Sequence, residues 1–218
     1  AKEVLPKLNA FKERWKNDPR ANGIPTDAIK ARRPRDWHKK FKWDAIRFAN
    51  KTYAVYDACT RSKGWCVWMD ADTFIHSPWK HKEFNNLLPQ HDYITYVGRG
   101  KGSQTWPECG FYGLNLNHPV CHEFLKEFER MYEDAENGIF KEKEWHDSYI
   151  FDVVRKWHES KFGVKNNDYA KGLIKGEGHP IINTELGSYI DHMKGDRKSL
   201  GKSKRSDLKV KRSEDHWL

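Results

Sequence analysis

Long apolar runs are missing from this 218-residue chain. No stretch approaches the roughly 18 consecutive apolar residues that a transmembrane helix needs. The first residues also lack the charged and apolar pattern of a signal peptide. We therefore expect no membrane span and interpret the chain as soluble and cytoplasmic.

Cysteine is scarce, and its spacing excludes two classes of site. The four cysteines are Cys59, Cys66, Cys109 and Cys121, and no two of them form a Cys-x-x-Cys pair. Such spacing argues against a zinc knuckle or a dithiol redox motif. We expect reduced and mostly buried thiols rather than disulfides. Internal repeats are absent as well.

Aromatic residues and positive charge are plentiful. Aromatic side chains make up 14% of the sequence, more than a disordered chain would carry, and the length suits one folded domain. The net charge of +9 can attract nucleic acids, anionic membranes or phosphorylated small molecules, so charge alone does not select a partner. Lysine and arginine are densest near the end. We predict a domain over 1–203 and a solvated basic tail over 204–218.

Hydrophobic periodicity predicts alternating helices and strands. Such alternation favours an α/β fold with a mixed, mostly parallel sheet flanked by helices. The first strong strand signal follows two predicted helices. Either an opening βαβ unit is missing from this chain, or the fold never had one. The predicted helices cover 2–16, 37–60, 119–136 and 146–160, a loop covers 17–36, and the predicted strands cover 64–69, 92–97, 109–116 and 188–193.

Two carboxylates follow the strand predicted over 64–69, which we expect to be buried on both faces. Asp70 and Asp72 stand one residue apart, so strand alternation directs them to the same side. Together they can hold a hard divalent cation, which would neutralise a diphosphate. A polar turn that caps the next segment is the alternative interpretation.

A second group of chemically suited residues lies far along the chain, over 192–198. His192 can complete the shell of a cation and favours Mn²⁺ over Mg²⁺. Gly195 would permit close approach of the backbone to a phosphate, and Lys194 and Lys198 supply positive charge. The alternative is a solvent-facing histidine followed by a basic tail.

Together the two segments resemble glycosyltransferases of the A-type fold, in particular glycogenin, the bacterial lipopolysaccharide galactosyltransferases and small viral and phage glycosyltransferases. In that group an Asp-x-Asp strand end and a distal His-x-x-Gly-x-x-Lys bind Mn²⁺ and the donor diphosphate. Asp70, Asp72, His192, Gly195 and Lys198 match those positions. The family usually continues with Pro-Trp, whereas this chain continues with 199–200, Ser-Leu.

Two further segments match the donor-binding parts of the family. In the helix that precedes the metal strand, Arg47 matches an arginine that reaches the donor phosphates, and Lys51 lies one turn further on the same face. An ordinary basic stripe is the alternative for this pair. Residues 108–110 (Glu108, Cys109 and Gly110) match a strand that lines the donor-sugar pocket, where glycine lets the backbone come close. The alternative for Gly110 is a β-bulge.

A last matching segment begins the helix predicted over 146–160. Asp147 falls where the family places a carboxylate beside the reacting sugar. It would orient the acceptor or the sugar, or deprotonate an acceptor hydroxyl in an inverting reaction. Capping of the helix is its alternative role. For Asn115 and Asn117 we predict capping of the helix that begins near 118.

The resemblance implies a metal-dependent transfer of a sugar from a nucleotide-diphosphate sugar to a hydroxyl of a glycan or glycoprotein. It leaves open the sugar, the base, and whether configuration is retained or inverted. It also fits a phage- or virus-encoded enzyme acting in a host cytoplasm. Two alternatives remain: a basic nucleic-acid-binding module, and a nucleotidyltransferase-like metal enzyme. Carboxylates hinder phosphate binding without a metal, so we expect no nucleic-acid partner. The Gly-rich basic phosphate loop that nucleotidyltransferases commonly carry is not visible, which argues against the second alternative.

Overall fold

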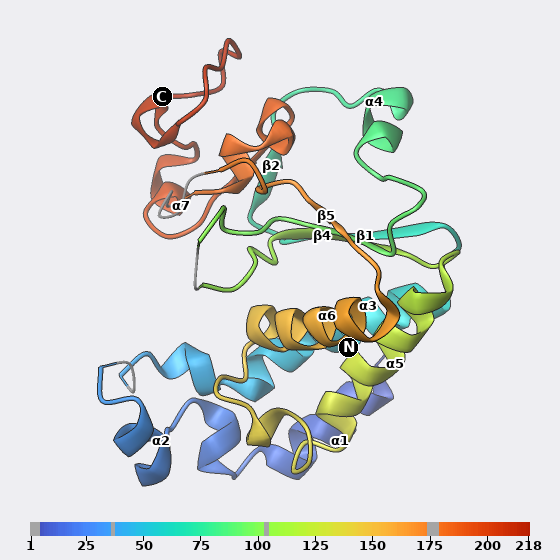
Figure 1. The fold of residues 1–218 in the computed structure, drawn as a ribbon. Coiled ribbons are helices and arrows are strands. Elements are labelled where there is room, and N and C mark those ends of the chain that lie inside the picture. Colours follow the sequence, from blue (N-terminus) through green and yellow to red (C-terminus); the bar gives the residue numbers. More distant parts are fainter. Residues whose placement is uncertain (1–4, 36–37, 103–104, 174–178) are drawn as a thin grey trace. The chain divides into compact units, whose positions relative to one another are not determined.

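The computed structural model describes residues 5–35, 38–102, 105–173 and 179–218, and the chain forms two compact units (Figure 1). The first unit comprises Ala1–Lys63 and His122–Gly163, and the second comprises Gly64–Cys121 and Val164–Leu218. Within the described ranges, no helix combines the length and the apolar character that crossing a bilayer requires.

The first unit is helical. Its helices bury aromatic side chains against one another: Phe11 of the first helix contacts both Tyr53 and Tyr132, with ring centroids 5.9 Å apart in each pair. Aromatic pairs of this kind add to the stabilisation from burial alone. The α-helices are α1 (Pro6–Trp15), α2 (Asp27–Arg32), α3 (Ala45–Thr60), α5 (Pro119–Glu133), whose first residues belong to the second unit, and α6 (Asp147–Phe162).

Helix α3 is shorter than the sequence predicts, since the predicted helix over 37–60 is divided. A short 3₁₀ segment, Lys40–Trp43, comes first, and α3 begins only at Ala45. The break lies at Asp44, whose carboxylate accepts a hydrogen bond from the Arg47 amide at 3.0 Å and so caps the new helix.

The second unit contains a four-stranded sheet and a two-stranded ribbon. In the sheet the order is β1-β4-β3-β5, and β4 runs antiparallel to both neighbours, while β5 runs parallel to β3. The α/β class with a mixed sheet is therefore confirmed, but the expected predominance of parallel pairing is wrong, since β4 pairs antiparallel with both β1 and β3 and the parallel pair is β3 with the two-residue β5. The sheet strands are β1 (Trp65–Met69), β3 (Ile94–Tyr96), β4 (Phe111–Asn115) and β5 (Asn167–Asp168); the ribbon pairs β2 (Thr73–Ile75) with β6 (Ile190–His192); the helices are α4 (His81–Asn86) and α7 (Arg197–Leu200).

Strand β1 differs from its expected environment. We predicted a strand buried on both faces, but each of its residues is only half-buried. The reason is its place in the sheet order, because β1 is an edge strand that pairs with β4 alone among the described strands. Its neighbour β4 is buried throughout, and Phe111 of β4 belongs to the apolar core with Ile181, Leu186 and Ile190.

The expectation of reduced, mostly buried thiols is confirmed, whereas the C-terminal segment differs from the expected tail. All four cysteines are free, and all but the half-buried Cys66 are buried, as predicted. The C-terminal segment is largely exposed, as predicted, but it is anchored by its end, since Trp217 is only 4% exposed and His216 is also buried. Its high content of lysine and arginine had suggested a solvated segment, whereas its last aromatic residues pack into the second unit.

Candidate metal centre

The turn between β1 and β2 positions the two carboxylates. The Asp70 amide donates to the Gly110 carbonyl at 2.9 Å, and the Thr73 amide donates to the Asp70 carbonyl at 3.0 Å. The indole of Trp68 donates to Oδ1 of Asp70 at 2.7 Å, which orients that carboxylate. The hydrogen bond to Gly110 and the tight turn at Asp70 thus fix the place where the chain leaves β1.

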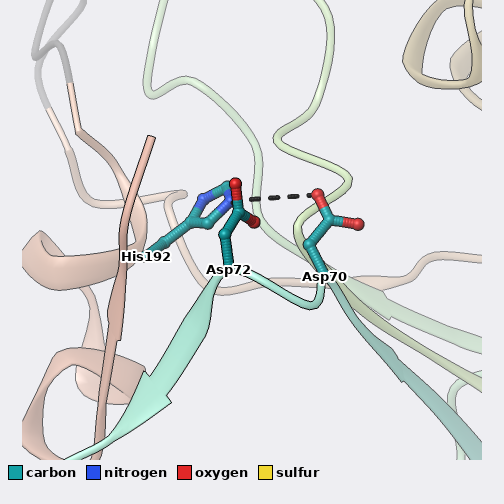
Figure 2. Close-up of side chains that lie close together, drawn as sticks. All are labelled: Asp70, Asp72 and His192. Carbon is teal, nitrogen blue, oxygen red and sulfur yellow. Dashed lines mark hydrogen bonds and ion pairs between the residues drawn. The ribbon is translucent and has the colours of Figure 1, made fainter. Parts of the chain in front are cut away.

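The β2–β6 ribbon brings a histidine to the same turn. In the ribbon register Thr73 faces His192, and the Met193 amide donates to the Asp72 carbonyl at 2.7 Å. Nε2 of His192 consequently lies 3.1 Å from Oδ1 of Asp72 and 3.8 Å from Oδ2 of Asp70. Figure 2 shows the three side chains converging from the turn and from β6.

The geometry of Asp70, Asp72 and His192 suits a divalent cation. Their ligand atoms all lie within 4.8 Å of one another. A cation about 2.0–2.2 Å from each ligand holds the ligand atoms roughly 3–4 Å apart, so only small adjustments are needed. The His192 side chain is 2% exposed, whereas both carboxylates are nearly a third exposed, which leaves one side of the group open to solvent.

The charge state of the group also favours a cation. Burial lowers the pKa of His192 below its ordinary value, although Glu108 and Asp72 act in the opposite direction. A neutral imidazole is the form that binds metals. Burial alone would raise the pKa of Asp72, but Lys198 and His192 outweigh it and lower that pKa, so the carboxylate stays ionised.

Gly110 of the segment before β4 leaves the space that the imidazole fills. A Cβ atom built on Gly110 would lie 2.6 Å from Cε1 and 2.9 Å from Nδ1 of His192. Contacts that short are essentially never seen for real Cβ atoms. The resemblance had suggested a glycine that lets the backbone approach a sugar; in the structure the neighbour that excludes a side chain at this position is His192.

Glu108 is buried in an ion-pair cluster within the same unit. Its carboxylate accepts from Nη2 of Arg99 at 2.7 Å and from Nζ of Lys194 at 3.0 Å. Burial by itself would raise the pKa of Glu108, but Arg99 and Lys194 lower that pKa to about 2. The adjacent Cys109 is also buried. The three predicted positions 108–110 therefore lie beside the histidine, with the carboxylate of Glu108 already paired.

The predicted phosphate-binding segment lies beside the same carboxylates. Lys198, in α7, forms an ion pair with Asp72, with Nζ and Oδ2 2.9 Å apart. Gly195 has a φ of 65°, and a Cβ at that position would meet nothing within 4 Å. Glycine is therefore favoured here because the backbone adopts a left-handed conformation in the turn that leads into α7. A close approach of other atoms to this backbone is not the reason.

Three predicted residues belong to the first unit, which is described separately from the metal centre. Lys51 of α3 forms an ion pair with Asp147 of α6, with Nζ and Oδ2 2.9 Å apart and both side chains largely buried. The Arg47 guanidinium lies 5.7 Å from the ring centre of Phe48. The structure thus joins Lys51 to Asp147 and places neither in the triad's unit.

The capping role given as the alternative for Asp147 is not found, and the capping role predicted for Asn115 and Asn117 is wrong. The N-cap of α6 is His146, whose side chain accepts from the Tyr149 amide, so Asp147 is already inside the helix. At the start of α5, the Val120 amide donates to the imidazole of His118. Asn115 instead donates to carbonyls in the 90–92 loop and accepts from the Asn117 amide. Histidine acts as a cap through a ring nitrogen, which sequence rules for caps do not include.

Sequence reasoning missed three contributors to this region: Trp68, Arg99 and Asp191. Each lies within ten residues of a predicted site residue, but none belongs to a motif with a recognisable spacing. An open pocket of about 680 Å³ is lined mainly by apolar side chains of β1, β2 and the segment that follows β2, including Met69, Trp79 and Phe84. Comparisons with protein-family models, curated proteins and solved structures found no match to this chain.

Proposed function

We propose that this chain is a metal-dependent glycosyltransferase that moves a sugar from a nucleotide-diphosphate sugar to a hydroxyl of a glycan or glycoprotein. The observation that carries the proposal is the convergence of Asp70, Asp72 and His192, residues separated by 120 positions, at distances a cation can bridge. The mixed sheet is compatible with the A-type fold that the motifs resemble.

In this proposal the donor lies on the open side of the triad. A bound Mn²⁺ or Mg²⁺ would supply Lewis-acid stabilisation of the departing nucleoside diphosphate. Lys198 adds a cation at the same place, because its ammonium group already lies beside Asp72. Lys194 stays near as the partner of Glu108. The positive φ of Gly195 turns the chain so that both lysines flank the centre.

The reaction breaks the bond between the anomeric carbon and the diphosphate oxygen and forms a bond to the acceptor oxygen. The acceptor proton leaves to a base. We assign the sugar pocket to the 108–110 segment, which belongs to the same unit as the triad. Arg47, Lys51 and Asp147 belong to the first unit, so their roles in binding the donor phosphates and orienting or deprotonating the acceptor stay predictions from the resemblance.

The test is hydrolysis of a panel of nucleotide sugars with Mn²⁺, Mg²⁺ and no metal. We expect Mn²⁺-dependent release of a nucleoside diphosphate that is abolished in Asp72→Ala. Arg61→Ala is a matched control, because this exposed charge on the first unit pairs only locally with Asp57. Turnover by Asp72→Ala at the wild-type rate would rule out the metal role. Salt-sensitive nucleic-acid binding that survives neutralisation of Asp70 and Asp72 would instead favour the binding module.

A further inference from the structure

The buried carboxylate of Asp191 lies next to the metal centre but is not part of it. Asp191 precedes His192 in β6 and is 0% exposed. Successive side chains of a strand point to opposite faces, so Asp191 projects away from the triad. Nothing in the proposed sugar transfer uses this carboxylate.

The partners of Asp191 come mainly from the end of the chain. The amide and the hydroxyl of Ser203 donate to the carboxylate at 2.7 and 2.6 Å. Nε2 of His216 donates to it at 2.8 Å, and Nε2 of His179 lies 3.6 Å from it. Both oxygens of a fully buried carboxylate are therefore occupied, which holds the group in one orientation.

Residues 203–218, the C-terminal strap, are fastened at several points within the second unit. The Leu218 amide donates to the Ser203 carbonyl at 3.2 Å, which closes the strap on itself. Nε of Arg212 donates to the Ile182 carbonyl at 2.9 Å. The Lys209 amide donates to the side chain of Asn183 at 2.6 Å. The strap is thus an ordered element and not a passive tail.

The strap also contacts the other strand of the ribbon. The ring of His216 stacks on His76, with centroids 4.4 Å apart, and on Phe74, with centroids 5.5 Å apart. Phe74 pairs with Asp191 in the β2–β6 register, and the next pair along the ribbon is Thr73 with His192. One residue of the strap, His216, therefore touches both strands immediately beside the metal centre.

His192 needs such support because its ring lacks a hydrogen bond that metal-binding histidines usually make. Metal-binding histidines usually donate their second ring nitrogen to a carboxylate or carbonyl, which fixes the ring. Here Nδ1 of His192 is buried and has no hydrogen-bond partner in the described part of the chain. The position of the ring therefore comes from the backbone of β6, from packing against Gly110 and the ring of His179, and from the contact of Nε2 with Asp72.

We propose that the C-terminal strap is a positioning element of the metal centre: by binding Asp191 it fixes the backbone of β6 and thereby the place of the His192 imidazole. This inference rests on the metal site of the proposed function. Asp191, Ser203 and His216 are positioning residues that act through the strand and do not touch the cation.

The test compares three single variants of the full chain. His216→Phe keeps a ring for stacking but removes the donor to Asp191, His216→Gln keeps a donor, and Asp191→Asn replaces the carboxylate by an isosteric amide. Tyr53→Phe is the control, since it removes a hydrogen bond to Glu133 in the first unit and leaves the strap intact. Mn²⁺ affinity is measured by electron paramagnetic resonance, and pulsed measurements detect coupling between Mn²⁺ and an imidazole nitrogen.

We expect His216→Phe and Asp191→Asn to weaken Mn²⁺ binding about 10- to 100-fold, the usual cost of losing support for a metal ligand. Both should also weaken the nitrogen coupling. His216→Gln should recover most of the affinity, and Tyr53→Phe should retain all of it. Thermal unfolding without metal identifies any variant that fails to fold; should His216→Phe do so, Asp191→Asn decides.

Folded His216→Phe or Asp191→Asn protein with wild-type Mn²⁺ affinity and unchanged nitrogen coupling would overturn the strap's role and leave the proposed function standing. The opposite pattern of results also distinguishes the strap's positioning role from the proposed sugar transfer. If the wild type binds Mn²⁺ through a nitrogen and the strap variants weaken it, but no nucleotide sugar is cleaved, the positioning role holds and the sugar transfer fails. A wild type that binds no Mn²⁺ overturns both.

Discussion

Replacement of Gly110 by alanine tests the packing at the metal centre directly. The backbone at Gly110 lacks a positive φ, so alanine is conformationally allowed and the effect of the change is steric. The added Cβ would lie 2.6 Å from Cε1 of His192, whereas ordinary contacts begin at 3.4 Å. The imidazole, the strand or both must therefore move by about 0.8 Å.

A displacement of that size matters more for a metal than for the fold. Overpacking of a well-packed site costs about 1–3 kcal/mol of unfolding free energy. Metal–ligand distances tolerate only about 0.2 Å, so the same movement should remove His192 as a ligand and lower Mn²⁺ affinity at least about 10-fold. We expect Gly110→Ala to lose metal affinity while it remains folded at room temperature.

Gly113→Ala is the matched control, because Gly113 lies in β4, the strand that Gly110 precedes. A Cβ on Gly113 would lie 2.8 Å from Thr95 and 3.1 Å from Trp65, so it overpacks the sheet without touching His192. Thermal unfolding and Mn²⁺ titration of both variants separate the two effects. The reasoning is refuted if Gly110→Ala binds Mn²⁺ as tightly as wild type, or if Gly113→Ala loses as much affinity.

Three other outcomes can be measured on the same protein. Mn²⁺ at 100 times its dissociation constant should raise the unfolding free energy by about 2.7 kcal/mol in wild type and not in Asp72→Ala, as seen by thermal unfolding. The pKa of Glu108 is about 2 in the folded protein against an ordinary 4.5, so its ion pairs stabilise the fold fully above pH 4.5 and the stabilisation is lost as the pH falls toward 2. Denaturant titrations should accordingly show the stability difference between wild type and Glu108→Gln shrinking by about 3 kcal/mol over that range; a constant difference contradicts the assignment. Lys51→Met should cost about 3 kcal/mol by leaving the buried Asp147 carboxylate without this ion pair, and adding Asp147→Asn should restore part of it; purely additive effects would show that the pair is not coupled.

The main elements could be predicted because their side chains carry a periodic signal. In α1, Leu8, Phe11 and Trp15 recur at helical spacing and are all buried. The strands over 65–69 and 111–115 lie inside the predicted runs. Such segments bury one face or a continuous apolar run, and burial of this kind produces a recognisable pattern of apolar and polar residues along the sequence.

The ribbon and the strap could not be predicted in the same way. Strand β6 lies inside the strand predicted over 188–193, but β2 was not predicted, since its three residues are too few for a period. The pairing of the two strands joins positions more than 110 residues apart, which no local pattern reveals. Phe74 and Ile75 of β2 are exposed, so burial leaves no pattern there. The high charge of the strap indicated solvent, while its anchors are the single residues His216 and Trp217. Isolated anchors have no spacing to detect.

The candidate site shows the same division between motif and support. The motifs gave Asp70, Asp72 and His192, because carboxylates at a strand end and a distant imidazole are recognisable as donor types. They did not give the reason that the imidazole lies where it does. The ring has no partner on Nδ1 within the described residues, and two features beside it carry no ligand chemistry in the motifs: the missing side chain of Gly110, and the buried carboxylate of Asp191, to which we assign a positioning role. A sequence reveals groups that can bind a cation more readily than groups that only hold them still, because the second kind is chosen for shape and for hydrogen bonds that exist only once the chain has folded.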